Sequence, residues 1–363
     1  MSTIYITERD ASFKIYSRYF KVFQNHKQRF CIPIRNISQF IVFGNINLPK
    51  QVIQIVRLNQ IPVLYLTQTG EYLGRVENPS ATQTKYLKYQ QRSIHNTEFN
   101  HATAESMIWA KLHNQHTFLQ SWTRNYTSYE TQRALDYLTL LMDNLPIAPS
   151  INDLRDFCTE ADKVYYCAFA SLLNFHSNGY PGTTAKRASR FLQLGNQLLH
   201  QYIYTLLNTA GLHPDYAVLH EDGYYELPLA WDFAAEFRAP VVDDLVLNFT
   251  RNLTNSNGNG KNSNTLLKRF LQSWEAKLKT FILHPYAGEV SYRQCMDLQV
   301  KEYVKSLLGD VEYYRPLALK FNPNQVKGQK SKVKREDNNV EELVLSANNN
   351  STQNSSQLVR FLQ

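Results

Sequence analysis

One histidine and two acidic residues in the second half of the chain lie at spacings that could serve chemistry. Asp232 follows His220 by twelve residues, and Glu236 follows it by sixteen. Because Asp232 and Glu236 are four residues apart, they share one face of an α-helix. An imidazole with two carboxylates can hold a divalent metal ion. The same acids can also be an N-terminal helix acid and the partner of a nearby base, so both interpretations stay open.

Cysteine usage and apolar runs limit the class of protein. The chain has 363 residues, which suits two domains at roughly 100–200 residues each. Its four cysteines, Cys31, Cys158, Cys167 and Cys295, form no C-x-x-C pair, which argues against a zinc ribbon and favours a reducing, cytoplasmic location. No apolar run reaches the roughly 18 residues of a membrane span, and the first residues lack the pattern of a secretory signal. We therefore expect no membrane partner.

The formal charge of +8 favours a polyanionic partner. Nucleic acid is the usual polyanion of the cytoplasm, although a basic surface also serves solubility alone. A basic run near the C-terminus leaves a similar choice between a solvated tail and a flexible arm that contacts nucleic-acid phosphates. This run consists of Lys327, Lys330, Lys332, Lys334 and Arg335. Charge suggests nucleic acid without establishing it.

The periodicity of apolar residues changes near residue 79. Residues 1–78 alternate and are rich in β-branched and aromatic types, which predicts a mostly antiparallel sheet with one short helix. Residues 79–99 predict a linker helix, and the apolar stripes of 100–316 predict an all-α helical bundle. The Asn-, Gly- and Ser-rich segment 252–265 is expected to be a flexible insertion, and 317–363 a disordered tail. The expected fold class is α+β, with more than one domain.

Five sequence motifs follow one another in order. The first is FGNINLPKQVIQIVRLNQIPVLYLTQTGEYLGRV, which contains Gly44, Ile61, Pro62, Val63, Gly70, Tyr72 and Gly74. The second is a K-x-x-N-Q helix with Lys111, Asn114 and Gln115. The last three are AGLHPDYAVLH, LAWDFAAEFRAPVVD and GEVSYRQCMDLQVKEYVKSLLGDVEYYRPL. Together they span about residues 3–316 and resemble the CRISPR-associated endonuclease and integrase family, Cas-one. Five motifs in the right order carry this resemblance more strongly than any single one.

The resemblance implies both an architecture and an activity. The implied fold is an N-terminal β-sandwich-like domain followed by an α-helical domain. The implied assembly is a homodimer, with two dimers bridged by a second small protein, Cas-two. The implied function is the capture of short double-stranded DNA fragments and their insertion into a CRISPR array. A Glu, a His and a further acid of the helical domain would hold Mg²⁺ or Mn²⁺, which would polarise the phosphoryl oxygen.

Two of the three implied ligand positions are problematic. The resemblance places His220 on the metal-binding histidine, but the first glutamate of the family falls on Cys158. Glu160 lies two residues further on, about 200° around a helix, and could replace it only if the helix start shifts in register. Otherwise Glu160 is a first-turn acid that opposes the helix dipole, and Cys158 is a small buried residue.

The remaining acid of the family falls on Ala235, three residues after the aspartate of its D-x-x-E-E-F-R motif. Asp232 and Glu236 match the acids on either side of that position. Glu236 points about 100° away from Ala235 around a helix, so its substitution as a ligand is not automatic. Arg238 and Asp243 match the rest of the motif and are expected to brace the site or bind phosphate.

Binding of DNA needs only lysines or arginines on one surface, in contact with phosphates. The candidates in the helical region are Arg238, Lys186, Arg187, Arg190, Lys268 and Arg269. Tyrosines could stack on a splayed DNA end, and Tyr165, Tyr166 and Tyr180 are near the candidate site in sequence. We expect Tyr165 and Tyr166 to belong to the core instead.

Three hypotheses about function remain. The first is an active metal-dependent integrase or endonuclease that uses Glu160, His220 and either Glu236 or Asp232 as ligands. The second is a catalytically silent relative that binds DNA or pairs with a competent subunit. The third is an unrelated basic nucleic-acid-binding protein, which the order of the motifs disfavours. For the first two we expect weak or no cleavage with Mn²⁺ and retained, salt-sensitive binding of duplex DNA.

Overall fold

The computed structural model describes most of the chain up to Leu319 and a short segment near the C-terminus. The described residues are 2–8, 11–24, 27–76, 85–123, 128–175, 181–220, 226–255, 263–319 and 360–361. The basic run 327–335, Tyr180, most of the predicted tail and the middle of the predicted insertion lie outside them. Within these ranges, no helix combines the length and the apolar character that crossing a membrane requires.

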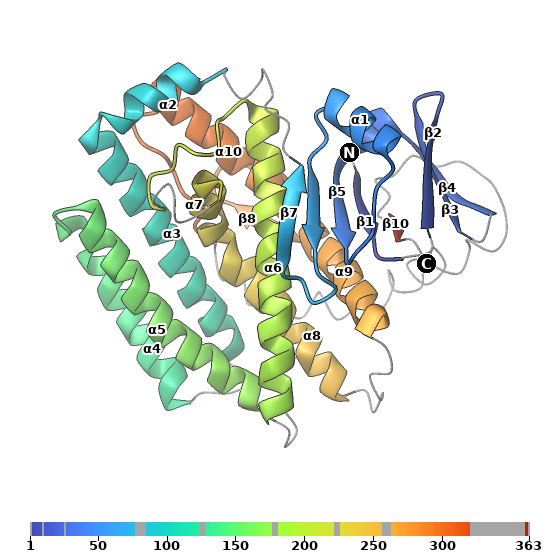
Figure 1. Ribbon diagram of the computed structural model, residues 1–363. Helices are drawn as coiled ribbons and strands as arrows, with labels where there is room; N and C mark the ends of the chain where they lie inside the picture. Colours follow the sequence, from blue (N-terminus) through green and yellow to red (C-terminus); the bar gives the residue numbers. More distant parts are fainter. Residues whose placement is uncertain are drawn as a thin grey trace. The chain divides into compact units, whose positions relative to one another are not determined.

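The larger of the N-terminal sheets has the strand order β10-β1-β5-β6-β7 (Figure 1). Its strands are β1 (Ser2–Ile6), β5 (Ile37–Phe43), β6 (Val63–Leu66), β7 (Tyr72–Val76) and β10 (Arg360–Phe361). The strands β1, β5 and β6 pair in parallel, and only β7 is antiparallel to its neighbour. This sheet therefore differs from the mostly antiparallel sheet that the alternation predicts, because crossover connections rather than hairpins join these strands.

A smaller antiparallel sheet and one helix complete the N-terminal region. The sheet consists of β2 (Ala11–Tyr16), β3 (Tyr19–Gln24) and β4 (Lys27–Pro33), and the helix is α1 (Lys50–Leu58). The two sheets bury a common apolar core in which the rings of Phe20 and Phe40 lie 4.9 Å apart, edge to face. The predicted β-sandwich-like arrangement, followed by a mostly helical region, is confirmed.

The larger sheet has apolar side chains on both of its faces. In β1, Ile4 and Ile6 join the core that is shared with the smaller sheet, whereas Tyr5 joins the helical core. This division follows from the alternation of side chains along a strand. The hydroxyl of Tyr5 donates a 2.6 Å hydrogen bond to Glu275 in the helical region. The N-terminal sheet thus packs against the helices as well as against the smaller sheet.

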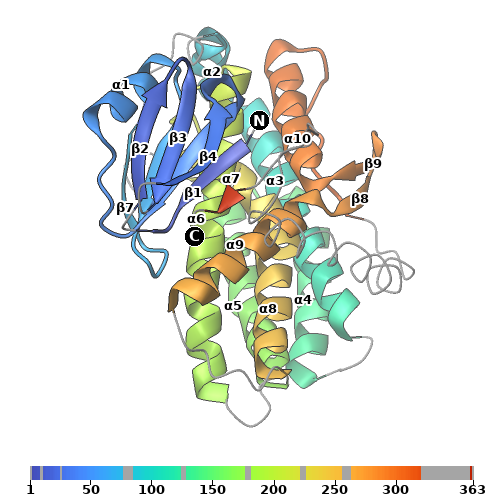
Figure 2. The same ribbon diagram turned by 90° about the vertical axis from the view of Figure 1, so that its right-hand side faces the viewer.

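The helical region follows the N-terminal sheets in the chain and consists mostly of α-helices (Figures 1 and 2). Its helices are α2 (Leu87–Ile94), α3 (Thr97–Thr123), α4 (Tyr129–Asn144), α5 (Ile151–Phe175), α6 (Pro181–Ala210), α7 (Pro228–Phe237), the π-helix η4 (Arg238–Asp243), α8 (Asp244–Asn255), α9 (Ser263–Lys279) and α10 (Tyr292–Leu308). A hairpin of β8 (Phe281–His284) and β9 (Gly288–Ser291) interrupts them. The expectation of an all-α region therefore missed this hairpin.

A glycine lets α6 approach the π-helix that follows α7. A Cβ added at Gly195 would lie 2.7 Å from Cγ1 of Val242, closer than real Cβ contacts. Only a residue without a side chain therefore fits this crossing. The close approach fixes η4, and with it Arg238 and Asp243, against the helical core.

Candidate functional site

His220 is carried by a loop that is fixed at both of its ends. The helix α6 ends in a Schellman motif, in which the amides of Gly211 and Leu212 donate to the carbonyls of Asn208 and Leu207 at 3.2 and 3.0 Å. The left-handed φ of +90° at Gly211 suits glycine and turns the chain out of the helix. The buried side chain of Gln90 in α2 then holds the backbone of the following loop through its amide and carbonyl groups.

Asp232 closes the other end of this loop. Its fully buried carboxylate accepts hydrogen bonds from the backbone amides of Val218, Leu219 and His220 at 2.7, 3.1 and 2.9 Å. The same carboxylate lies 2.7 Å from Nδ1 of His220. The structure thus brings together the pair that the twelve-residue spacing suggested.

The contacts of Asp232 define a positioning role for it. Both of its oxygens are engaged by the loop, and an aspartate at Nδ1 fixes the orientation of an imidazole and leaves Nε2 as the nitrogen for a ligand or a proton. The side chain of His220 is 23% exposed. The start of α7 places Asp232 correctly because Pro228 occupies the first helical turn, directly after Leu227 with its left-handed φ of 54°.

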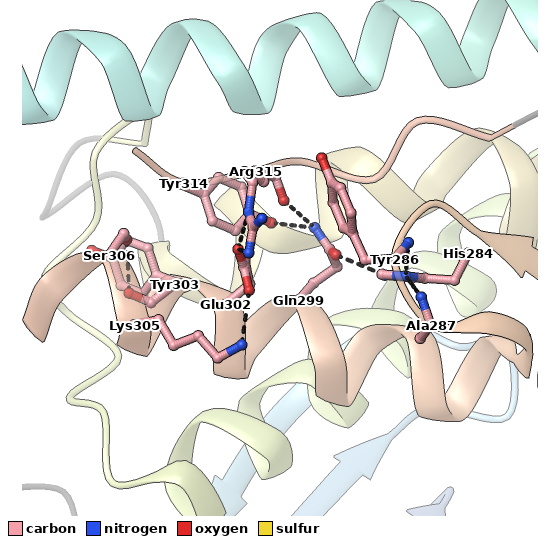
Figure 3. A network of polar contacts seen from close by, with 10 residues as sticks. All are labelled: His284, Tyr286, Ala287, Gln299, Glu302, Tyr303, Lys305, Ser306, Tyr314 and Arg315. Atoms are coloured by element: carbon pink, nitrogen blue, oxygen red, sulfur yellow. Dashed lines mark hydrogen bonds and ion pairs between the residues drawn. The ribbon is translucent and has the colours of Figure 1, made fainter. Parts of the chain in front are cut away.

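Glu236 lies one turn after Asp232 but serves a different part of the protein. Its fully buried carboxylate accepts hydrogen bonds from Tyr314 Oη at 2.6 Å and from the amide of Leu317 at 3.2 Å. Nε2 of Gln299 in α10 lies 3.4 Å from the same carboxylate. Gln299 also donates to Tyr314 and to the carbonyl of Arg315 (Figure 3). Glu236 therefore anchors the segment after α10.

Burial changes the protonation of Glu236. Desolvation raises the pKa of its carboxyl group to about 7, while the hydrogen bonds from Tyr314, Leu317 and Gln299 oppose this rise. A group that is neutral over part of the physiological range and closed in by three donors is a poor ligand for a hard cation.

Glu160 lies on an exposed face of α5. Its carboxylate pairs with Lys163 of the same helix, with Oε1 and Nζ 2.6 Å apart. It belongs to the exposed surface, whereas Asp232 is fully buried. Across the described residues, no group of three or more His, Cys, Asp and Glu side chains is arranged to hold a metal ion. The four predicted ligands are therefore not gathered, and only His220 and Asp232 are in contact.

Cys158, the residue on the implied glutamate position, faces a buried lysine. The ammonium of Lys111 in α3 lies 2.8 Å from the Cys158 sulfur and 2.7 Å from Oδ2 of Asp162. Gln115, one turn after Lys111, donates to the other oxygen of Asp162 at 2.9 Å. Burial lowers the pKa of Lys111, but Cys158 and Asp162 outweigh burial and raise it above its ordinary value. The lysine is therefore charged.

This lysine cluster and the loop of His220 adjoin the same helix face. Arg155, Cys158 and Asp162 are spaced by three and four residues along α5, so their side chains share one face. The guanidinium of Arg155 donates from Nε to the carbonyl of Leu219 at 2.7 Å. Cys158, at the position expected for an acidic ligand, is thus one helical turn from Arg155, which holds the His220 loop. The sulfur of Cys158 contacts the ammonium of Lys111.

Arg238 and Asp243 extend the buried polar cluster. Asp243 is fully buried and accepts a 2.8 Å hydrogen bond from Tyr165, and desolvation raises the pKa of its carboxyl group to about 7. Tyr166, Asp162 and Asp243 together outweigh the burial of Arg238 and raise its pKa above its ordinary value. Of the two expected roles, these contacts favour bracing over phosphate binding, and they place Tyr165 in the core as expected.

The other predicted DNA-binding residues differ in their surroundings. Lys186 and Arg187 are exposed on α6. Arg190 of the same helix donates to the carbonyl of Gln68 at 2.7 Å, and Lys268 forms an ion pair with Glu8. Together with the exposed Arg269 of α9, Lys186 and Arg187 remain the candidates whose charges lie on the described surface.

Comparison with known proteins decides the family. The family model described as CRISPR associated protein Cas1 matches residues 4–276. The chain belongs to this Cas1 family. A curated relative, "CRISPR-associated endonuclease Cas1 3" of Thermus thermophilus, is 26% identical over 305 residues, which cover 79% of this chain and 88% of the relative.

Solved structures related to the Cas1 family share the fold. A chain of a "Cas6-RT-Cas1--Cas2 complex" matches with a TM-score of 0.72 at 16% identity, over 88% of this chain and 36% of that one. A "Casposase bound to integration product" matches with a TM-score of 0.72 at 15% identity, over 92% of this chain and all of that one (100%). At these identities, the similarity establishes the fold alone.

The divalent cation that the Cas1 resemblance implies does not fit the described side chains. Ala235 has no donor atom, and the sulfur of Cys158 is in contact with the Lys111 ammonium. The carboxylate of Asp232 is held by three backbone amides, and that of Glu236 by Tyr314 and the chain after α10. His220 alone is a weak site for Mg²⁺ or Mn²⁺, which favour several oxygen ligands.

The motifs of the sequence contained a signal for this cluster that spacing alone did not reveal. The sequence by itself identifies Lys111, Asn114 and Gln115 only as a motif. In the structure, Lys111 and Gln115 contact Asp162, while Asn114 donates to the carbonyls of Glu236 and Leu317 at 2.9 and 3.1 Å. A lysine within an otherwise apolar helix stripe is such a signal, because a buried ammonium requires a partner.

Proposed function

We propose that this chain takes part in CRISPR adaptation as a DNA-binding member of an integration complex, and that its own candidate site, the Lys111 cluster with the adjoining His220 loop, performs no metal-dependent phosphodiester chemistry. Membership of the Cas1 family and a fold shared with a casposase bound to an integration product support the first part. The contact of the Lys111 ammonium with Cys158 and Asp162 carries the second part.

Electrostatics explains why this contact matters. Two unit charges 4 Å apart interact with roughly 4 kcal/mol at the effective dielectric of a protein, and a dication doubles that figure. Lys111 already neutralises Asp162, so a divalent cation beside Cys158 would meet the repulsion of the ammonium with no unpaired acid of the pair to offset it. This cluster therefore favours the ammonium of Lys111 over a bound metal ion.

The proposed partners are double-stranded DNA, a second copy of the chain and a small Cas2-type protein. The net charge of +8 and the exposed Lys186 and Arg187 support contact with DNA phosphates. The likeness to a chain of the "Cas6-RT-Cas1--Cas2 complex" supports the protein partners. Because a Cas2-type protein would bring several chains together, a competent subunit in the same complex could supply the chemistry.

The deciding experiment measures cleavage of branched DNA with Mn²⁺ by the full chain. We expect no cleavage by the wild type, alongside salt-sensitive binding of duplex DNA. The double substitution Cys158→Glu with Ala235→Glu restores both missing acids and is expected to restore cleavage. Adding His220→Ala to the double variant should abolish it again, because the ring is then lost.

A matched control uses the other histidine of the same loop. His213→Ala removes a ring that contacts Tyr216, away from Asp232, and should leave the cleavage by the double variant unchanged. Robust Mn²⁺-dependent cleavage by the wild type that disappears in His220→Ala but persists in His213→Ala would contradict the proposal of a silent pocket. Absence of duplex binding by a folded wild type would contradict the proposal of a DNA-binding function.

A further inference from the structure

The smaller sheet of the N-terminal region has an outer face that carries no residue of the candidate site. Figures 1 and 2 both show β2, β3 and β4 on the side of the larger sheet that is opposite to α6. One face of this small sheet is buried against the larger sheet through Phe13, Phe20 and Val22. The opposite face is therefore available for contacts outside this core.

Strand register places basic and aromatic side chains together on that outer face. Lys14 pairs with Lys21, and Tyr16 pairs with Tyr19, across β2 and β3. Because side chains alternate along a strand, these residues share the face opposite to Phe20 and Val22. The outer face of β2–β4 includes Lys14, Tyr16, Tyr19, Lys21 and Phe23.

The aromatic rings of this face are unusually open to solvent. Tyr16 is 67% exposed and Tyr19 is 43% exposed. The ammonium of Lys21 lies 5.1 Å from the ring centre of Tyr16, and that of Lys14 lies 5.4 Å from the ring centre of Phe23. Each lysine thus accompanies a ring, which places a phosphate-binding charge beside a stacking surface.

The turn between β2 and β3 keeps the two tyrosines at its base. Ser17 and Arg18 have left-handed φ angles of 46° and 67°, as a two-residue hairpin turn of type I′ requires. Such turns normally use Asn or Gly, because other residues are strained there. The strain is tolerated here at a turn that presents the exposed Arg18 between two exposed tyrosines.

The charge of this region has a single sign. Residues 11–36 include six basic residues and no acid. The basic residues are Lys14, Arg18, Lys21, Lys27, Arg29 and Arg35. In the part of the chain that the structure describes, none of the six forms an ion pair with a carboxylate. The surface therefore complements a polyanion.

We infer that the outer face of β2–β4 binds single-stranded nucleic acid, with bases stacked on Tyr16 and Tyr19 and phosphates held by Lys14 and Lys21. A duplex keeps its bases stacked on one another, so it would use the charges but not the rings, whereas unpaired bases can lie flat on both. This face is distinct from the Lys111 cluster and the His220 loop. It is also distinct from Lys186 and Arg187, which the proposed function assigns to duplex DNA.

The test measures binding of fluorescein-labelled oligo(dT) and oligo(U) to the full chain by fluorescence anisotropy at several salt concentrations. Tyr16→Ala with Tyr19→Ala should weaken binding about ten-fold or more, because two stacking contacts are lost. Lys14→Gln with Lys21→Gln should reduce the slope of log affinity against log salt by about 1.4, at roughly 0.7 for each phosphate contact on a single strand. The two oligonucleotides distinguish DNA from RNA as the source.

Two controls separate this site from folding and from the proposed function. Tyr129→Ala removes a tyrosine of α4 that is 77% exposed and should leave oligo(dT) affinity unchanged. Tyr16→Phe with Tyr19→Phe keeps the rings and should retain wild-type affinity. Affinity for a matched duplex is expected to change much less in the alanine pair. Wild-type single-strand affinity and salt slope in both the alanine and the glutamine pairs, at unchanged melting temperature, would overturn the inference.

Discussion

The ammonium of Lys111 lies 2.8 Å from the sulfur of Cys158, on the helix face of α5 that also holds the loop of His220 through Arg155. The positive charge of Lys111 thus lies beside Cys158, the position that the family resemblance assigns to an acidic ligand. The neighbouring Asp162 completes the ion pair at 2.7 Å. The expected stability of this pair and the proposal of a site without metal chemistry both rest on this contact.

Lys111→Met should destabilise the protein by about 2–3 kcal/mol. Removing one partner of a fully buried ion pair costs roughly 3–5 kcal/mol. The cost is smaller here because the side chain of Asp162 is 30% exposed, and solvent weakens the pair. Urea unfolding at neutral pH measures the change. Lys163→Met, in the exposed pair with Glu160, is the matched control and should leave the unfolding midpoint in place. Equal effects of the two substitutions would contradict the importance of the buried pair.

Asp232→Asn should release the loop that carries His220. The amide of asparagine has one accepting oxygen in place of two, so at least one of the three backbone donors loses its partner, at a cost of about 2–3 kcal/mol. Hydrogen exchange should accelerate at the amides of Val218, Leu219 and His220. The comparison is Asp215→Asn, on the exposed part of the same loop. Unchanged protection of those three amides would show that Asp232 does not hold the loop.

Stability should fall as pH rises toward neutrality because of Glu236. Burial raises the pKa of its carboxyl group from an ordinary 4.5 to about 7, so between these values the folded state holds a proton that the unfolded state has lost. The stabilisation is fully present below about pH 4.5 and is lost as pH rises through about 7, by roughly 3 kcal/mol in total.

Glu236→Gln tests this dependence, because glutamine cannot ionise. The difference in unfolding free energy between the variant and the wild type should increase in favour of the variant from pH 5 toward neutrality. Asp243 carries a similar shift and is unchanged in the comparison, so it cancels. Glu160→Gln, at an exposed carboxylate, serves as the control for the loss of a glutamate charge. A constant difference across this range would contradict a raised pKa for Glu236.

Excess MnCl₂ should leave the melting temperature of the wild type unchanged. A ligand that binds only the folded state stabilises it by RT ln(1 + [L]/Kd) and so raises the melting temperature. The described side chains form no group that suits a metal ion. Cys158→Glu with Ala235→Glu should introduce a Mn²⁺-dependent rise. This measurement needs no catalytic activity. A rise in the wild type that His220→Ala removes would show that a metal site exists.

Local sequence patterns determined much of the fold and one contact of the candidate site. Alternation of apolar residues predicted strands in the N-terminal region, and helical spacing across 100–316 predicted a mostly helical region. The interval between His220 and Asp232 is short enough for a loop to close on the next helix, and the structure has that contact at 2.7 Å. Such features depend on neighbours within a few turns, whose geometry the backbone itself fixes.

Only the tertiary structure decided what the acidic residues do. Asp232 and Glu236 share a helix face, yet one holds the His220 loop and the other holds Tyr314, 78 residues later. Lys111 meets Cys158 and Asp162 only because α3 packs against α5. Periodicity shows which face of a helix is buried but not which distant side chain lies opposite, because that depends on how whole elements pack. The packing of the helices therefore decided the partner of each buried charge, and with it the chemistry that the candidate site can support.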